Sequence, residues 1–206
     1  MSQPSDHSVG TDLDSVPLRR VPTQTRSREK VSRALVAADV IARRDGVEAL
    51  TLTRVAEEAG LSVGALHQYL PDREAIAAAL VARYHERIEA QMDAIIDRVE
   101  VGAVDDPVRE VIGRIAQIYT EERSVRLVRA MGAVAADGGR AHKARMVDKL
   151  RELMVRCGMP GTDMAVVRIV FASADAVMHE AFAGDEPDAT LLAELETMLR
   201  AYLDQR

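Results

Sequence analysis

The sequence predicts an all-α protein. From Ser27 onward, apolar residues recur at the three- and four-residue spacing of amphipathic helices. No segment alternates apolar and polar residues as a half-buried strand would, and no internal repeat is evident. Composition agrees, because aromatic residues make up only 3% of the chain and Trp is absent, whereas Ala, Val, Leu, Met and Arg are abundant. Apolar residues reach 48%, enough for a globular core.

Capping residues and helix breakers delimit four helices in the N-terminal half. Ser, Thr and Asp are favoured before a helix because their side chains accept hydrogen bonds from unpaired backbone N–H groups, and Gly or Pro ends a helix. The first expected helix runs from Ser27 to about Arg44, carries Val31, Leu35, Ala38 and Ile41 on one face, and ends near Gly46. A short second helix is capped by Thr51 or Thr53 and ends at Gly60. A third is capped by Ser62 and ends before Pro71, and a long fourth runs from Asp72 to about Glu100.

Five more helices are expected after Glu100. Asp106-Pro107 places a capping residue before a proline at the first helical position, which is a typical helix start. Glycine-rich stretches at 137–139 and 158–161 interrupt the pattern. The fifth expected helix runs from Pro107 to about Tyr119, and the sixth from Val125 to Ala136, ending at Asp137-Gly138-Gly139. The seventh runs from Arg140 to Cys157. The eighth runs from a cap at Thr162 to Phe182, and the ninth from Asp188 or Thr190 to about Asp204.

Charge is distributed unevenly along the chain. The net charge is −6, but six basic residues and one acid lie between Arg19 and Arg33, whereas eight acids and two arginines lie from Asp175 to the C-terminus. A basic segment on an acidic body can bind phosphates locally. The same segment can also be a solvated tail and helix face, and the sequence leaves both interpretations open.

The N-terminal segment and the single cysteine indicate the cellular compartment of the protein. Residues 1–24 are rich in Ser, Asp, Gln, Thr and Pro and are expected to form a disordered leader. Met1–Gly10 are polar, so no signal peptide is expected, and the longest apolar run, Ala75–Ala82, is too short to span a bilayer. Cys157 has no second cysteine for an internal disulfide, which fits a reducing compartment. We therefore expect a soluble, cytoplasmic protein without a membrane partner.

The stretch Thr51–Leu70 is the most informative part of the sequence. A helix-turn-helix needs two helices that cross steeply around a tight turn. A small side chain is required where the helices touch, and Ala56 supplies it. Four residues later the turn needs a residue that tolerates positive φ, and Gly60 supplies that. The apolar contacts between the helices are expected from Val55, Ala59, Leu61 and Leu66. Because several requirements are met at fixed spacing, the stretch predicts a helix-turn-helix rather than an ordinary helical hairpin.

The segment from about Arg26 to Leu80 resembles the DNA-binding domain of the tetracycline-repressor (TetR) family of bacterial regulators. The shared features are Ala37-Ala38 in the first helix, Gly46, Thr51, the run Val-Ala-x-x-Ala-Gly-Leu-Ser followed by Gly-x-Leu, and the corner Pro71-Asp72-Arg73-Glu74. The resemblance covers about a quarter of the chain. It implies a nine-helix architecture, with a helix-turn-helix domain at residues 25–71 and a helical ligand-binding and dimerisation domain at 72–206.

Four positions depart from the family pattern. His67 stands where the family usually has Tyr, and Arg73 where it usually has Lys; both can still donate hydrogen bonds to phosphates. Leu70 replaces the usual Phe, and Ala42 lies near a position where a bulky aromatic residue is common. These two smaller residues imply a smaller domain core.

The family architecture implies that the short helix from about Val63 to Tyr69 lies in the major groove of double-stranded operator DNA. Gln68 is the first candidate for base readout, because an amide can pair bidentately with adenine. Val63 and Ala65 can contact thymine methyl groups, and Gly64 allows the backbone to approach the DNA closely.

Other residues of the motif are expected to contact phosphates and so position the helix. Arg54 can contact a base or a phosphate, and Tyr69 can instead pack in the core. The expected phosphate contacts are Thr51, Thr53, Ser62, His67, Tyr69 and Arg73.

The resemblance also implies a small-molecule effector bound among the fourth to eighth helices. Methionine suits an adaptable pocket, although at helical spacing it is also ordinary core. Asp175 and His179, one helical turn apart, can orient a polar ligand, pair across a dimer interface or form a half-exposed i,i+4 pair. The candidate ligand-binding residues are Met92, Ile96, Ile115, Tyr119, Met131, Met146, Met154, Phe171, Asp175 and Met178.

The eighth and ninth helices carry more apolar surface than one side of a monomer core needs. In the eighth these residues are Val166, Val167, Val170, Phe171, Ala174, Val177 and Met178; in the ninth they are Leu191, Leu192, Leu195, Leu199 and Tyr202. We therefore expect a homodimer formed through helices 8 and 9 as a four-helix bundle.

Motifs for catalysis are missing. No His, Cys, Asp or Glu cluster has metal-ligand spacing, Cys157 and His142 each stand apart in the sequence, and neither glycine-rich phosphate loops nor Ser/His/Asp signatures occur. No cofactor is therefore expected, and an enzyme carrying this fold is the least favoured hypothesis. The leading interpretation is a transcriptional repressor released from its operator by a small molecule. The alternative is a similar regulator controlled by a protein partner or without any inducer.

Overall fold

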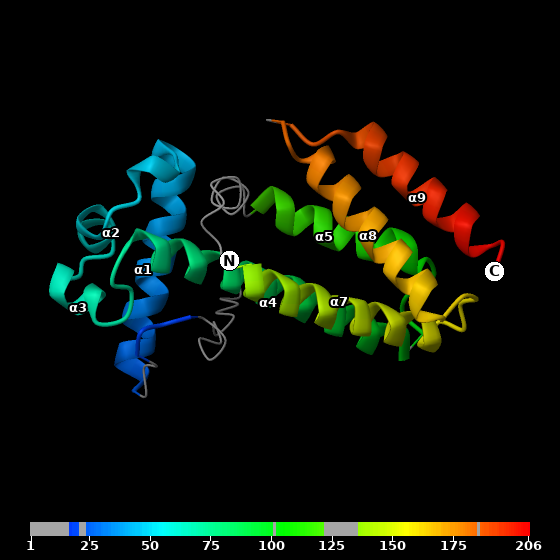
Figure 1. Cartoon of the computed structure of the whole chain (residues 1–206), viewed down its shortest axis with the longest axis horizontal. Coiled ribbons are helices and arrows are strands. Elements are labelled where there is room, and N and C mark those ends of the chain that lie inside the picture. The colour runs from blue at the N-terminus through cyan, green and yellow to red at the C-terminus, as the bar shows by residue number, and fades with distance from the viewer. Residues whose placement is uncertain (1–16, 21–23, 101, 122–135, 185) are drawn as a thin grey trace, which may run out of the picture. The chain divides into compact units, whose positions relative to one another are not determined.

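A computed structural model of the chain describes residues 17–20, 24–100, 102–121, 136–184 and 186–206. Within these ranges the protein has eight α-helices, one short 3-10 helix and no strand, which confirms the all-α prediction (Figure 1). The helices form two compact units: unit 1 holds the described residues up to Arg83, and unit 2 those from Tyr84 onward. The helix expected from Val125 to Ala136, except for Ala136 itself, and most of the expected disordered leader lie outside the described residues.

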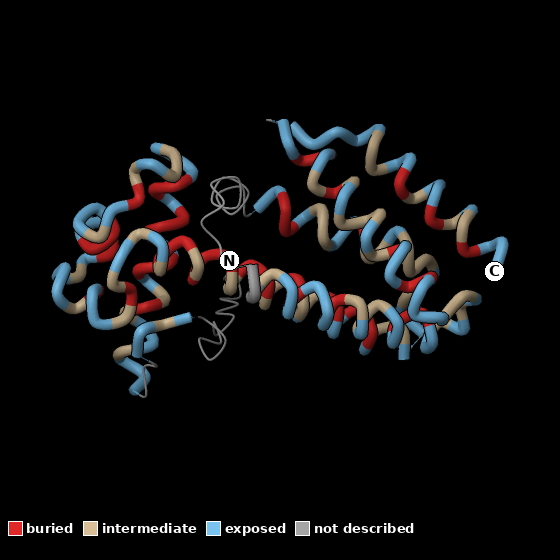
Figure 2. Tube along the Cα trace, viewed as in Figure 1, coloured by how far each residue is buried: buried red, intermediate tan, exposed pale blue. Residues whose placement is uncertain are grey.

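Unit 1 is the helix-turn-helix unit. It contains α1 (Thr25–Asp45), the 3-10 helix η1 (Val47–Ala49), α2 (Leu52–Glu58), α3 (Val63–His67) and the start of α4 (Arg73–Glu100). α1 packs against η1, α2 and α3, and α2 packs against α3. The stripe predicted for the first helix is buried, and in Figure 2 the buried positions of α1 recur between exposed ones. Leu70 and Ala42 are both fully buried, so the smaller residues at these positions do belong to the core.

The turn between α2 and α3 ends one helix and starts the next within four residues. Gly60 has φ +63°, the N–H of Leu61 donates to the carbonyl oxygen of Ala56 at 2.8 Å, and the N–H of Gly60 donates to that of Glu57 at 3.1 Å. This pair of bonds is a Schellman motif, which uses the last carbonyl groups of a helix and requires a left-handed residue. Ser62 then caps α3, because its hydroxyl oxygen accepts from the N–H of Ala65 at 3.2 Å.

Unit 2 contains the rest of α4, α5 (Pro107–Glu121), α7 (Ala136–Arg156), α8 (Met164–Ala181) and α9 (Ala189–Leu203). α8 packs against both α7 and α9, and α9 also packs against α5. The predicted caps form at two helices: Asp106 accepts from the N–H of Arg109 at 3.0 Å, and Asp188 accepts from the N–H groups of Thr190 and Leu191 at 2.9 and 3.0 Å. None of the described helices is both long enough and apolar enough to cross a bilayer.

The break predicted at Asp137-Gly138-Gly139 is wrong, because α7 begins at Ala136 and continues through these residues. Each glycine costs the helix about 1 kcal/mol relative to alanine. Apolar packing further along α7, where Leu153 and Met154 are almost fully buried, outweighs that cost.

Several other boundaries differ from the prediction by one or two residues. The N-cap of α8 is Asp163 rather than Thr162, and its side chain makes no capping hydrogen bond. α3 ends at His67 instead of Tyr69, although Gln68 keeps helical backbone angles of φ −63° and ψ −29°. Gln68 therefore still projects from the C-terminal end of α3 as a helical residue would.

Gly60→Ala is expected to lower the free energy of unfolding by about 1–2 kcal/mol, because an L-residue with a side chain is disfavoured in the left-handed conformation. A Cβ atom at this position would meet no heavy atom within 4 Å, so steric overlap adds nothing to the loss. Gly60→Asn is the matched control, since asparagine tolerates positive φ better than alanine. Urea denaturation of the three proteins measures the difference, and equal losses for Ala and Asn would contradict the backbone explanation.

Candidate nucleic-acid interface

α3 presents one face to the core of unit 1 and the other to solvent. Leu66 is almost completely buried and anchors the helix. The exposed residues are Val63, Gly64, His67 and Gln68, whereas Ala65 and Tyr69 are half-buried. The residues predicted to contact base edges therefore share the accessible part of one short helix. The half-burial of Tyr69 leaves both of its predicted roles open.

Thr51 and Ser62 each serve as a helix cap and remain exposed. The hydroxyl oxygen of Thr51 accepts from the N–H of Arg54 at 3.3 Å, at the start of α2, just as Ser62 does at the start of α3. A hydroxyl that accepts one bond still carries a hydrogen to donate. Both side chains can therefore donate to a phosphate oxygen without leaving their capping positions. Thr53, also exposed, lies one residue into α2.

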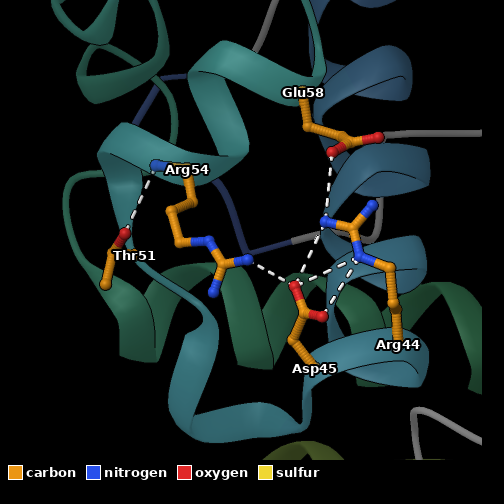
Figure 3. Close-up of polar contacts among 5 residues, drawn as sticks. All are labelled: Arg44, Asp45, Thr51, Arg54 and Glu58. Carbon is orange, nitrogen blue, oxygen red and sulfur yellow. Dashed lines mark hydrogen bonds and ion pairs between the residues drawn. The ribbon is translucent and has the colours of Figure 1, made fainter.

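Arg54 lies in a network of charged side chains at the junction of α1 and α2 (Figure 3). Its guanidinium binds the carboxylate of Asp45, the last residue of α1. Asp45 also accepts from Arg44, whose Nη2 lies 3.1 Å from Oδ2 of Asp45 and 3.5 Å from Oε2 of Glu58. The hydrogen bond from Arg44 is the main reason that the pKa of Asp45 lies below its usual value, with Arg54 contributing less. Asp45 is thus an anion shared by two arginines.

Arg73, the first residue of α4, has a similar partner. Its Nη1 lies 3.0 Å from Oε2 of Glu48, a residue of η1. Asp72 precedes it and caps α4, accepting from the N–H of Ala75 at 2.7 Å. The positive end of the helix and the Arg73 side chain therefore lie together, as a phosphate contact requires.

Asp45 and Glu48 are not among the site residues that the sequence predicts. In the connection between the first two helices, Gly46 indicates only a helix end. Asp45 lies nine positions from Arg54, and Glu48 lies further still from Arg73. Both distances fall outside the i,i+3 and i,i+4 spacing that reveals an ion pair within one helix. Only the fold brings these charges together.

One described part of the basic N-terminal segment contacts the end of the motif. The backbone N–H of Arg19 donates to the carbonyl oxygen of Tyr69 at 3.0 Å. Arg19 and Arg20 are exposed. This stretch of the predicted leader therefore lies beside the residues that follow α3.

The candidate ligand-binding residues lie in unit 2, apart from Met131, which is outside the described residues. Ile115, Phe171 and Asp175 are half-buried. The other candidates are almost fully buried: Met92, Ile96, Tyr119, Met146, Met154 and Met178. Phe171 and Asp175 line a groove of about 480 Å³ between α7 and α8, together with Lys143, Met164 and Arg168 among others.

Asp175 and His179 take part in more than an isolated pair. Nδ1 of His179 lies 3.5 Å from Oδ1 of Asp175, while the other carboxylate oxygen of Asp175 lies 2.6 Å from Nζ of Lys143 on α7. The His179 ring packs edge-on against the Tyr119 ring at a centroid distance of 5.6 Å. The pair therefore links α8 to α5 and α7.

A second polar cluster lies inside unit 2. The rings of His85 and His142 stack at 3.9 Å, and Nδ1 of His142 lies 2.7 Å from Oε1 of Glu89. Burial raises the pKa of Glu89, but hydrogen bonds from Arg145 and His142 together outweigh burial and hold that pKa below its usual value. His142, which stands apart in the sequence, is thus in contact with residues more than fifty positions away.

Comparison with known proteins relates this arrangement to regulators. Residues 34–80 match the family model described as bacterial regulatory proteins, tetR family. The chain is 30% identical over 129 residues to the HTH-type transcriptional repressor KstR of Mycolicibacterium smegmatis, covering 62% of this chain and 61% of that repressor. It is 26% identical over 155 residues to KstR of Rhodococcus jostii, covering 69% and 68%. The chain thus spans less than two thirds of the first relative's length.

The fold is also similar to that of a solved structure. A TetR-family transcriptional regulator from Streptomyces coelicolor superimposes with a TM-score of 0.64 over 85% of this chain and 98% of that one. The two sequences are 20% identical. At this identity the likeness establishes a shared fold.

Proposed function

Given that the chain belongs to the tetR family of bacterial regulatory proteins through its residues 34–80, we propose that it is a sequence-specific DNA-binding transcription regulator. The observation that carries this proposal is the exposed face of α3, which buried Leu66 anchors to the core of the helix-turn-helix. The protein acts as a repressor in this proposal, because its relatives KstR of Mycolicibacterium smegmatis and of Rhodococcus jostii are transcriptional repressors. It works in the cytoplasm, where bacterial operator DNA is found.

In this proposal α3 enters the major groove and its exposed residues read the operator. Gln68 pairs with a base edge, while Val63 and Ala65 contact thymine methyl groups beside the closely approaching backbone of Gly64. The side chains that contact phosphates are Thr51, Thr53, Arg54, Ser62, His67, Tyr69 and Arg73. Their exposure or half-burial in unit 1 supports these roles.

A second copy of the chain is the other partner that we propose. α8 and α9 pack against each other within one chain. Six of the apolar residues that the sequence assigned to the dimer surface are buried in this single-chain core instead: Val166, Val167, Val170, Met178, Leu195 and Leu199. Large apolar side chains remain exposed elsewhere on the same helices: Met164 at 39%, Ile169 at 51% and Met198 at 45%. An isologous dimer through α8 and α9 would cover them. Two recognition helices that enter successive major grooves must lie about 34 Å apart.

A small molecule that binds unit 2 controls the DNA affinity in this proposal. α4 is continuous from Arg73 to Glu100, and the division between the two units falls within it. Met92 and Ile96 are buried in its C-terminal half, so a ligand that displaces them would act on the helix that carries Arg73. Control by a protein partner, or no inducer at all, is the alternative.

Gln68→Ala should relax base preference at one operator position and weaken operator binding by about 1–3 kcal/mol, because one bidentate base contact is lost. Arg73→Ala is the matched control. It removes a phosphate contact, so it should weaken binding to all sequences and reduce the salt slope by about one ion. Fluorescence titrations with operator and random duplexes at several salt concentrations separate the two effects. Equal losses on both duplexes for Gln68→Ala would show that Gln68 reads no base.

Ligand control predicts reciprocal coupling. A thermal-shift screen should find a small molecule that raises the unfolding temperature, because a ligand that binds only the folded state stabilises it. That ligand should weaken operator binding, and operator should weaken ligand binding by the same factor. A ligand that binds tightly and leaves operator affinity unchanged would contradict ligand control and favour the alternative.

A further inference from the structure

Two arginines that we propose as phosphate contacts are each bound by a carboxylate from one short segment of unit 1. Asp45 binds Arg54, and Glu48 binds Arg73 at 3.0 Å. We call these two acids, which lie on either side of Gly46 and Val47, the acidic corner (Asp45 and Glu48). Nothing in the helix-turn-helix motif requires acids here, and an acid beside a phosphate contact opposes DNA binding electrostatically.

The backbone of this segment allows both acids to reach their partners. α1 ends at Asp45, and Gly46 follows with φ +83°, a conformation that side-chain-bearing residues rarely adopt. η1 then begins at once and carries Glu48. The two acids therefore lie on different helices, and one binds an arginine of α2 while the other binds the first residue of α4.

The two acids differ in how their negative charge is compensated once the arginine binds DNA instead. Asp45 keeps a second cation, since Arg44 lies within hydrogen-bond distance of it at 3.1 Å. Glu48 is 80% exposed, so water solvates its carboxylate readily. Neither acid is therefore left as a buried, uncompensated charge, and both arginines can be released at a modest cost.

We propose that the acidic corner competes with DNA phosphates for Arg54 and Arg73, and so limits the affinity of the protein for any DNA backbone. This inference rests on the proposed DNA-binding function. The guanidinium groups must give up carboxylate hydrogen bonds before phosphate oxygens can take their place. The competition affects phosphate contacts alone, so it weakens binding to operator and random DNA by the same factor and leaves sequence preference to α3.

The test uses the full-length chain and a short duplex of arbitrary sequence, so it needs no knowledge of the operator. Asp45→Asn and Glu48→Gln each remove one competing charge at nearly constant shape. Each should raise affinity about two- to fivefold at low salt, the range expected for loss of one exposed ion pair. Fluorescence anisotropy measures the dissociation constants, and thermal unfolding of each variant shows that it is folded.

The arginines supply matched backgrounds that separate competition from general repulsion. The gain from Asp45→Asn should vanish in Arg54→Ala protein and persist in Arg73→Ala protein. The gain from Glu48→Gln should show the opposite pattern. Glu57→Gln is a further control, because Glu57 is an exposed acid of α2 with no ion pair among the described residues, and its loss should change affinity less than twofold.

Gains that persist in both arginine backgrounds, or that Glu57→Gln reproduces, would overturn the proposal and indicate general charge repulsion. No gain from either variant would overturn it as well. If Asp45→Asn fails to fold, the variants of Glu48 and Arg73 alone test the proposal, because the Glu48 side chain is 80% exposed and its substitution does not disturb the core. A wild-type protein that binds no duplex even at low salt would overturn the proposed function itself, which distinguishes that failure from a failure of the acidic corner alone.

Discussion

The turn between α2 and α3 can close only if residue 60 takes a positive φ and the residue at 56 leaves room for neighbouring helices. Gly60 and the fully buried Ala56 meet both conditions. The two Schellman hydrogen bonds and the Ser62 cap then fix where α3 begins, and Leu66 fixes which face it turns inward. Every proposed base contact depends on this geometry, because the exposed side chains of α3 are placed by it and not by contacts of their own.

Charge has a different role from packing in unit 1. In the proposed function, the apolar core sets the position of α3, whereas the arginines around it set how strongly the protein attracts a phosphate backbone. Both Arg54 and Arg73 already have carboxylate partners in the free protein. How readily these arginines bind DNA therefore depends on the strength of their hydrogen bonds to phosphate relative to those they already make to carboxylates. In our proposal the acidic corner sets the strength of the carboxylate bonds and leaves the surface of α3 that meets the bases unchanged.

Local signals predicted the parts of the structure that depend on neighbouring residues. The capping roles of Thr51, Ser62 and Asp188 follow from side chains that bond to N–H groups two or three positions away. The false break at Asp137-Gly138-Gly139 arose because packing elsewhere in α7 outweighs low helix propensity. The acidic corner and the His85–His142 stack could not be predicted, because their partners are distant in sequence and only the tertiary fold brings them together.

The most direct test of the central claim, that unit 1 reads DNA sequence as part of a dimer, is repeated selection of bound duplexes from a random pool by the wild-type protein. The account predicts enrichment of one twofold-symmetric sequence, with half-site centres about 10 base pairs apart or a multiple of that spacing. Binding without enrichment of any sequence, or enrichment of a single unrepeated half-site, would contradict it.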